Sequence, residues 1–388
     1  MRICILSSFE DSLSRNTGYS VRIYNLARGL ADLGNKVHVI IPGFPDRIET
    51  MGHFFVHRFH GFLPRKILYF VAKLLGIAKP TTLFFYDPLF AFKIRRIIRS
   101  VDIVQIEQQA SGGFLVPVIT NIWKKPIVVD CHDAFQPLRV RHASKIRRFL
   151  ETFTEIFIYK YADIILTVSE KEKNILTFCG IKKEKIRVVP NGVEIERFSD
   201  PIIKPEDVKR KYCLENYRII VFLGNMEYLP NREAVELIAA KIAPIVCEEV
   251  KNVKFLIVGR CSKKIESPNL IFTGVVENSV EPLLISDVAV APLFQGSGTR
   301  LKILEYLACG LPVISTTKGV EGLNLGNGII IEDDLNEFAK SIIKVLKNQD
   351  LAEEMRKNAR SLVIHYDWKK ILVQLNKIYE ELLRMGPR

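Results

Sequence analysis

Residues 287–310 read DVAVAPLFQGSGTRLKILEYLACG, and they decide the class of fold. The apolar run DVAVAPL predicts a buried β-strand. Gly296 and Gly298 predict a loop, and the apolar spacing from Leu301 to Cys309 predicts a helix. A strand, a glycine-rich loop and a helix in that order are typical of α/β proteins built on a parallel sheet.

Short apolar strands alternate with helical patterns along the rest of the chain. Strands are expected at residues 2–7, 36–41, 102–106, 127–131, 164–168, 186–189, 218–224, 254–259, 270–273, 288–291, 312–315 and 329–331. Helical patterns lie between most of them, the first over 18–33, and three more run from 335 to 383. The chain is therefore expected to form helix-covered parallel sheets.

The chain length predicts two domains. At 388 residues, and with about 150 residues per domain, two separate cores are expected. A polar, proline-containing stretch over 190–205 is the expected linker. We expect an N-terminal domain over 1–200 and a C-terminal domain over 201–366, with the last helix, 367–388, a candidate to pack back on the first domain.

Composition excludes several classes of protein. The 48% hydrophobic and 26% charged fractions exclude disordered, collagen-like and disulfide-scaffold chains. The seven cysteines lie far apart without paired spacing, so neither a zinc ribbon nor a disulfide framework is expected. The sequence shows no signal-peptide pattern, and the most apolar stretch, 67–78, contains Lys73 and is shorter than the roughly 20 residues of a spanning helix. A cytoplasmic protein is expected.

The net charge of +13 is concentrated in the first half. Residues 1–200 hold 30 Lys and Arg against 19 Asp and Glu, whereas the rest hold 26 against 24. This excess points to a polyanion, an anionic membrane or a phosphorylated substrate, or to a generally basic proteome. No nucleic-acid reading module is present, so nucleic acid is not an expected partner.

Two basic stretches, 62–99 and 139–148, suggest an anionic membrane surface. In the first, aromatic and apolar residues alternate with Lys and Arg, and the second contains no acidic residue. Basic amphipathic segments lie on anionic bilayers, although aromatic residues of a helix core with solvated charges would give the same pattern. We expect a peripheral protein at the inner face of the membrane with a lipid-linked or glycan acceptor.

The loop and helix of the opening stretch have the chemistry of a phosphate site. Glycines allow close backbone approach, and the first N–H groups and dipole of a helix favour an anion. Arg300 and Lys302 add donors, and the Glu305 carboxylate is placed to accept hydrogen bonds from a ribose diol. A nucleotide diphosphate suits this set: Gly296, Ser297, Gly298, Thr299, Arg300, Lys302 and Glu305. The alternative is a glycine-rich turn with solvated charges. The motif matches neither GxGxxG nor the P-loop.

Several motifs together resemble one known family. They are GSGTRLKILEYLACGLPVISTTKGVEGL at 296–323, VVPNGVEIERF at 188–198, YADIILTVSE at 161–170 and FLGNMEYLPN at 222–231. The chain resembles the retaining glycosyltransferases of family 4. This resemblance covers nearly the whole chain and implies the α/β GT-B fold, in which two Rossmann-like parallel-sheet domains face each other across a cleft.

The resemblance also implies roles for donor-site residues. Family members carry two glutamates eight positions apart, of which the second holds the donor ribose and matches Glu305. The first is replaced by Ser297. The Arg and Lys that clamp the diphosphate in many members are absent from 222–231, where this chain has asparagines and a tyrosine. Arg300 and Lys302 are the expected replacements for that clamp.

In the N-terminal domain, His132 follows a predicted strand where the family has a histidine that faces the donor sugar. Such a group can hydrogen-bond a sugar hydroxyl and stabilise positive charge at the anomeric carbon, although a lone histidine is more often structural. Asp133 is a candidate to orient His132 or to cap the next helix. The remaining cleft or acceptor candidates are Gly18, Tyr19, Glu107 and Asn191. Glu107 could equally be a solvated strand end, and the loop around Gly18 an ordinary helix start.

The sequence therefore predicts a hexosyltransferase that moves a sugar from a nucleotide diphosphate sugar, as co-substrate, to a hydroxyl acceptor with retention. Cell-surface polysaccharide, glycolipid or glycan assembly is the expected context. Neither a cofactor nor a metal is required. Two alternatives stay open: a nucleotide-sugar epimerase on the same scaffold, which needs no separate acceptor, and a non-catalytic partner subunit, suggested by the loss of the first glutamate.

Overall fold

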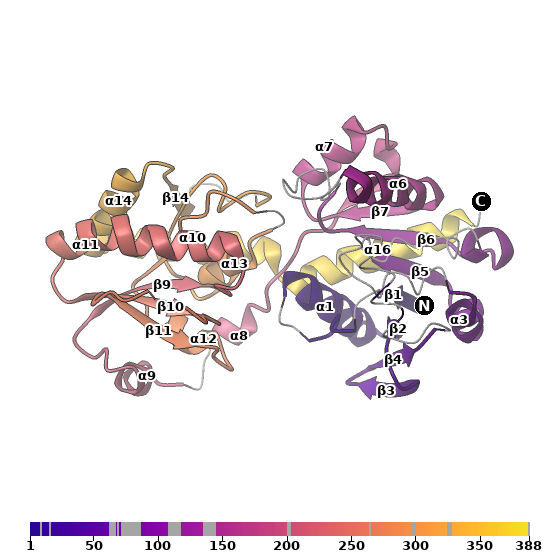
Figure 1. Cartoon of the computed structure of the whole chain (residues 1–388), viewed down its shortest axis with the longest axis horizontal. Helices are drawn as coiled ribbons and strands as arrows, with labels where there is room; N and C mark the ends of the chain where they lie inside the picture. The colour runs from indigo at the N-terminus through magenta and orange to yellow at the C-terminus, as the bar shows by residue number, and fades with distance from the viewer. Residues whose placement is uncertain are drawn as a thin grey trace. The chain divides into compact units, whose positions relative to one another are not determined.

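A computed structural model of the chain divides into two units. Unit 1 comprises Met1–Pro190 and Trp368–Arg388, and unit 2 comprises Asn191–Asp367. The residues described are 1–7, 10–14, 17–61, 67, 70, 87–107, 118–134, 145–199, 203–263, 265–296, 299–323 and 328–386. The strands of each unit form one sheet (Figure 1).

The sheet of unit 1 has eight strands among the described residues. In spatial order they are β3 (Arg47–Met51), β4 (Phe54–Phe59), β2 (Lys36–Pro42), β1 (Arg2–Leu6), β5 (Ile103–Glu107), β6 (Ile127–Cys131), β7 (Ile164–Thr167) and β8 (Ile186–Val188). All pairs are parallel except β3 with β4. The strand order reverses between β1 and β5, because β2 to β4 are added on one side of β1 and β5 to β8 on the other. Ligands of open α/β sheets bind at the carboxyl ends of strands beside such a reversal.

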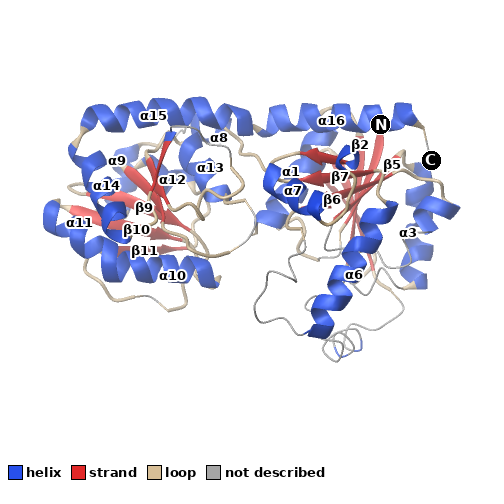
Figure 2. Ribbon diagram, turned by 90° about the horizontal axis from the view of Figure 1, so that it is seen from above, coloured by secondary structure: helices blue, strands red, loops and turns tan. Residues whose placement is uncertain are grey.

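Helices cover both faces of this sheet (Figure 2). They are α1 (Gly18–Asp32), α3 (Pro88–Ser100), η3 (Val118–Ile122), α6 (Lys145–Tyr161), α7 (Glu170–Phe178), η4 (Lys183–Lys185) and α16 (Trp368–Met385). Side chains of β1 alternate between the faces: Ile3 and Ile5 pack with α1 and α16, whereas Cys4 and Leu6 pack with α3 and α6. The C-terminal helix α16 is thus part of the core of unit 1.

Unit 2 has a six-stranded parallel sheet in the described residues. Its order is β11 (Leu270–Gly274), β10 (Val253–Val258), β9 (Arg218–Leu223), β12 (Val288–Ala291), β13 (Val313–Ser315) and β14 (Ile329–Ile331). The reversal lies between β9 and β12. One continuous apolar core joins the sheet to its helices, since β9 and β12 are fully buried over most of their length.

The helices of unit 2 follow the predicted alternation. They are α8 (Glu196–Ser199), α9 (Pro205–Lys211), α10 (Leu229–Leu237), η5 (Ile238–Ile242), α11 (Ala243–Glu249), α12 (Val280–Leu284), α13 (Leu301–Ala308), α14 (Leu335–Lys347), α15 (Gln349–Val363) and η7 (Ile364–Tyr366). None of the helices described in either unit combines the length and apolar character that crossing a bilayer requires.

The twelve strands predicted from the sequence are all present, with ends shifted by at most one residue. The prediction missed β3 and β4. These two strands form an antiparallel hairpin at the edge of the sheet, closed by a turn at Gly52 with φ 59°. β3 is largely exposed and polar, so it lacks the apolar run by which the other strands were recognised.

Candidate functional site

In unit 1, polar residues converge beside the reversal between β1 and β5. Glu107 is the last residue of β5, His132 directly follows β6, and Tyr19 lies in the first turn of α1. Parallel strands bring their carboxyl ends to one edge of a sheet, so Glu107 and His132 become neighbours. The structure thus brings together three residues that the sequence selected separately.

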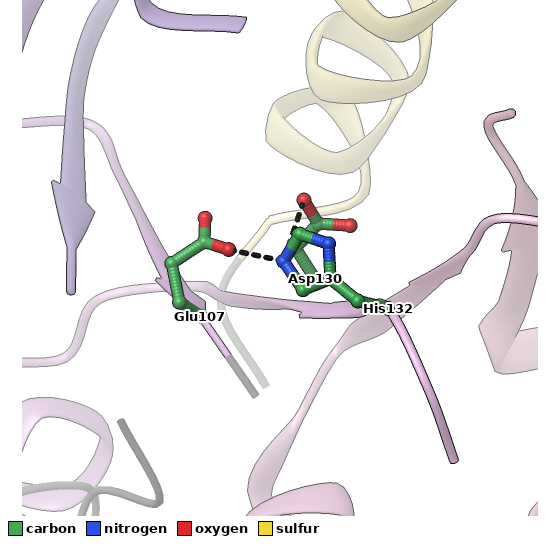
Figure 3. Close-up of side chains that lie close together, drawn as sticks. All are labelled: Glu107, Asp130 and His132. Atoms are coloured by element: carbon green, nitrogen blue, oxygen red, sulfur yellow. Dashed lines mark hydrogen bonds and ion pairs between the residues drawn. The ribbon is translucent and has the colours of Figure 1, made fainter. Parts of the chain in front are cut away.

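Glu107 and His132 form a close pair. The Nε2 atom of His132 lies 2.6 Å from Oε2 of Glu107, and both carboxylates drawn in Figure 3 lie beside the imidazole ring. The Glu107 side chain is fully buried and that of His132 is 11% exposed. The alternative of a solvated strand end for Glu107 is wrong, because its carboxylate is enclosed and hydrogen-bonded. Asp133, the residue after His132, is also buried. The rings of Tyr19 and His132 form a T-shaped pair with centroids 5.0 Å apart.

A buried ion pair lies next to the Glu107–His132 pair. Arg22 of α1 donates to both oxygens of Asp130, at 2.8 and 2.9 Å, and to the carbonyl of Pro190 at 3.1 Å. Asp130 Oδ2 lies 3.8 Å from Nε2 of His132. Burial opposes the ionisation of Asp130, but Arg22 and His132 outweigh it, and the pKa of Asp130 lies below its usual value. Burial and the charge of Asp130 raise the pKa of Glu107, although its hydrogen bonds oppose this.

Glu107, Asp130 and His132 each place a ligand atom within 4.8 Å of the others, a spacing that could hold a metal ion. Their atoms are already engaged. Both Asp130 oxygens accept from Arg22, whereas the Glu107 oxygens accept from His132 and Gln105. A cation would compete with a fully buried guanidinium, so the donor set fits a hydrogen-bonded charge network better than a metal site.

In unit 2, the loop before α13 lies beside the reversal between β9 and β12. Gly296 has φ 106°, a conformation that disfavours residues with a Cβ. A Cβ there would lie 3.0 Å from Nη2 of Arg300 and from the hydroxyl of Tyr228. Glycine is therefore favoured here both by its φ and by the little room that these two side chains leave. Ser297 and Gly298 lie outside the described residues.

Arg300 and Lys302, at the start of α13, both contact other parts of unit 2. The alternative of a glycine-rich turn with solvated charges does not describe them. Arg300 is the N-cap residue, is 8% exposed and donates to the carbonyl of Gln295 at 3.4 Å. Lys302 Nζ donates to Oδ1 of Asn231 at 2.8 Å and lies 4.0 Å from the centre of the Phe222 ring. Burial, reinforced by Arg300, lowers the pKa of Lys302 well below its usual value.

Two further features complete this end of α13. Thr299 Oγ1 is buried and has no hydrogen-bond partner among the described residues. Burial raises the pKa of Glu305, although a hydrogen bond with the Ser279 side chain and the charge of Arg197 oppose this. Arg197 itself donates to Asn278 at 2.8 Å. A polar or anionic ligand at this edge would therefore meet a hydroxyl, two cations and a carboxyl.

The remaining sequence candidates are placed as follows. Gly18 is the first residue of α1, whose N-cap Thr17 forms a capping box with Ser20. Asn191 is buried and begins unit 2. Of the basic stretches, 62–66, 68–69, 71–86 and 139–144 lie outside the described residues. In α3, Phe90 is buried, but Phe92 is 59% exposed and Arg95 covers its ring at 3.3 Å.

Four polar residues of the unit 1 site were not predicted from the sequence: Arg22, Gln105, Asp130 and Tyr379. Gln105 and Asp130 interrupt the apolar runs IVQIE and IVVDC, and Arg22 interrupts the apolar face of its helix. A polar residue inside a doubly covered strand must find a buried partner, which is a usable signal. Tyr379 gives no such signal, because it reaches Gln105 from 274 positions away.

Comparison with known proteins gives two family matches. Residues 17–197 match Glycosyltransferase Family 4, and residues 217–348 match Glycosyl transferases group 1. The chain is 24% identical to an uncharacterized glycosyltransferase, MJ1069, of Methanocaldococcus jannaschii over 70% of this chain and 72% of that protein. It is 23% identical to the phosphatidylinositol N-acetylglucosaminyltransferase gpi3 subunit of Schizosaccharomyces pombe, over 94% of this chain and 78% of that protein.

Its structure is similar to that of Alr3699/HepE of Anabaena solved in complex with UDP-glucose. The TM-score is 0.72 at 14% identity, over 98% of this chain and 100% of that one. At this identity the likeness shows the fold, which is that of two parallel-sheet α/β domains.

Proposed function

This chain belongs to the group 1 glycosyltransferases of GT-B fold, and from that premise we propose that its donor is a nucleotide diphosphate sugar held by unit 2. The observation that carries the proposal is the start of α13. Within seven residues it presents the hydroxyl of Thr299, the cations Arg300 and Lys302, and the carboxyl of Glu305 beside the β9/β12 reversal. The hydroxyl and the two cations can hydrogen-bond and neutralise a diphosphate, and the carboxyl can accept hydrogen bonds from a ribose diol.

The inward placement of Lys302 supports a role in phosphate binding. The Lys302 ammonium group lies 2.8 Å from a neutral amide oxygen and over an aromatic ring, and within the described part of the chain it forms no salt bridge. The charge of Glu305 offsets its burial only in part. The depressed pKa of Lys302 reports a poorly compensated charge, which a diphosphate would compensate. The Anabaena protein of the same fold binds UDP-glucose, which supports this donor class.

In the proposed reaction, the bond from the anomeric carbon to the phosphate oxygen breaks and a bond from that carbon to the acceptor oxygen forms. The nucleoside diphosphate takes the electron pair, and the acceptor proton passes to the leaving phosphate or to solvent. Helix N–H groups, Arg300 and Lys302 stabilise the leaving group without a metal. His132 hydrogen-bonds a hydroxyl of the sugar, and we propose that the configuration is retained.

We further propose an acceptor at an anionic membrane surface. The relative from Schizosaccharomyces pombe is named for transfer to phosphatidylinositol, and α3 exposes Phe92 beside the basic residues Arg95, Arg96 and Arg99. Basic residues interleaved with exposed aromatics favour anionic lipid headgroups. A lipid-linked or glycan acceptor in glycolipid or cell-surface glycan assembly fits these features.

Product analysis by NMR tests the proposal. The purified full chain is incubated with a panel of nucleotide sugars and with lipid and glycan acceptors. Transfer predicts release of the nucleoside diphosphate together with a new glycoside whose anomeric configuration matches the donor. An isomeric nucleotide sugar without free nucleotide would instead indicate an epimerase. Absence of turnover with every donor that binds would indicate a non-catalytic subunit.

A further inference from the structure

A chain of hydrogen bonds links the C-terminal helix to His132. The Tyr379 hydroxyl of α16 bonds Oε1 of Gln105, and Gln105 Nε2 donates to Oε1 of Glu107 at 2.9 Å. The other oxygen of Glu107 lies 2.6 Å from Nε2 of His132. Tyr379, Gln105 and Glu107 are fully buried, so water does not compete for these bonds.

The chemistry of each group fixes the direction of each bond. A carboxylate only accepts, so Gln105 must turn its amide nitrogen toward Glu107 and its carbonyl toward Tyr379. Tyr379 therefore donates. Burial and the carboxylates of Asp130 and Glu107 raise the pKa of Tyr379, which keeps this phenol protonated. Glu107 accepts from both sides, so Nε2 of His132 carries a proton.

We propose that Tyr379 and Gln105 are positioning residues that hold Glu107, and through it His132, so that the neutral imidazole is the Nε2–H tautomer and Nδ1 is its acceptor nitrogen. The helix α16 is then part of the machinery around His132 as well as part of the core. This inference rests on the proposed function, in which His132 hydrogen-bonds a hydroxyl of the sugar. If Nε2 carries the proton, that hydroxyl donates to Nδ1.

The described groups that contact His132 or the partners of those groups are consistent with this assignment. Glu107 comes from β5, Asp130 from β6, Tyr19 and Arg22 from α1, and Tyr379 from α16. Arg22 neutralises Asp130, which leaves Glu107 as the close acceptor for Nε2. The Tyr19 and His132 rings form a T-shaped pair, and the Tyr19 hydroxyl bonds Ser7 at 2.5 Å rather than Nε2.

The test is a long-range proton–nitrogen NMR spectrum of the full chain labelled with ¹⁵N-histidine, with His132 assigned by its loss in His132→Gln. At alkaline pH, wild type is expected to show Nε2 protonated and Nδ1 bare. Tyr379→Phe and Gln105→Leu are expected to give mixed tautomers and an Nε2–H that exchanges about tenfold faster, equivalent to about 1.4 kcal/mol. Tyr159→Phe, which removes another buried hydroxyl of unit 1, bonded to Cys131, is the control.

An Nδ1–H tautomer in wild type would overturn the proposal. So would a His132 signal unchanged in Tyr379→Phe and Gln105→Leu but altered in Glu107→Gln, since the relay would then end at Glu107. The NMR test of the His132 tautomer needs no substrate. Its failure is therefore distinguishable from failure of the donor proposal, which is tested by nucleotide binding to unit 2. With substrate, Tyr379→Phe is expected to lower kcat and leave KM nearly unchanged.

Discussion

Arg22 holds both oxygens of Asp130 at 2.8 and 2.9 Å, and neither side chain is exposed to solvent. This pair lies next to His132, where α1 meets β6. It ties the helix that follows the first strand to the strand that carries the histidine. The pair therefore fixes the position of Asp130 beside His132 in the unit 1 site.

Arg22→Met is expected to lower the free energy of unfolding by about 3–5 kcal/mol, because it leaves the Asp130 charge buried and unpaired. Urea unfolding measures this. Arg2→Met is the matched control, since Arg2 pairs with Asp102 at the surface and its loss should change stability far less. Equal losses for the two variants would contradict the buried ion pair.

Gly296→Ala is expected to weaken nucleotide binding at least about tenfold, because a Cβ at φ 106° strains the loop and meets Arg300 and Tyr228 at 3.0 Å. Isothermal titration calorimetry checks the affinity. Gly274→Ala is the control, with φ 73° and open space around its Cβ. An unchanged affinity in Gly296→Ala would show that the loop does not approach the donor.

Nucleotide binding should weaken as pH rises. Burial lowers the pKa of Lys302 in the free protein, whereas a bound diphosphate would raise it. At a pH between these two pKa values the free amine is neutral and the bound one is protonated, so binding takes up a proton. Calorimetry in buffers of different ionisation enthalpy measures the uptake. Lys302→Met should bind more weakly and lose this pH dependence, whereas exposed Lys340→Met should keep it. Proton release on binding, or the same uptake in Lys302→Met, would rule out this role.

The full chain should sediment with anionic vesicles at low salt and less at moderate salt, as electrostatic binding requires. Replacing Phe92, Arg96 and Arg99 by serine should reduce the bound fraction. Phe178→Ser is the matched control, because Phe178 is a 93% exposed aromatic of the same unit outside the basic stretches. If wild type fails to pellet at either salt concentration, membrane binding is excluded.

The sequence predicted the elements that have a local signature and missed those that depend on distant partners. Apolar runs such as IVVDC mark buried strands, and GSGTRLK marks a loop that opens a helix, so β6 and α13 could be located. Glu107 and His132 were recognised at strand ends. Their pairing was not, because it depends on β5 and β6 being neighbours in the sheet.

Arg22, Asp130, Gln105 and Tyr379 lie inside elements rather than at their ends, and so were not selected as site residues. The first three are polar within an apolar pattern, Tyr379 gives no such signal, and the role of each appears only when its partner is known. Those partners are separated by 108 positions for Arg22 and Asp130 and by 274 for Gln105 and Tyr379. Hydrogen bonds and ion pairs between residues so far apart leave no periodicity in the sequence.

The most direct test of the donor proposal is thermal unfolding of wild type and Glu305→Ala with UDP, GDP, ADP and their sugar conjugates, with Glu337→Ala as an exposed control. A nucleotide at about 100 times its Kd should stabilise the folded state by about 2.7 kcal/mol and raise Tm by several degrees. We predict this rise for one base in wild type and Glu337→Ala, and its loss in Glu305→Ala. No rise with any nucleotide at millimolar concentration, or an equal rise in Glu305→Ala, would contradict the proposed donor site.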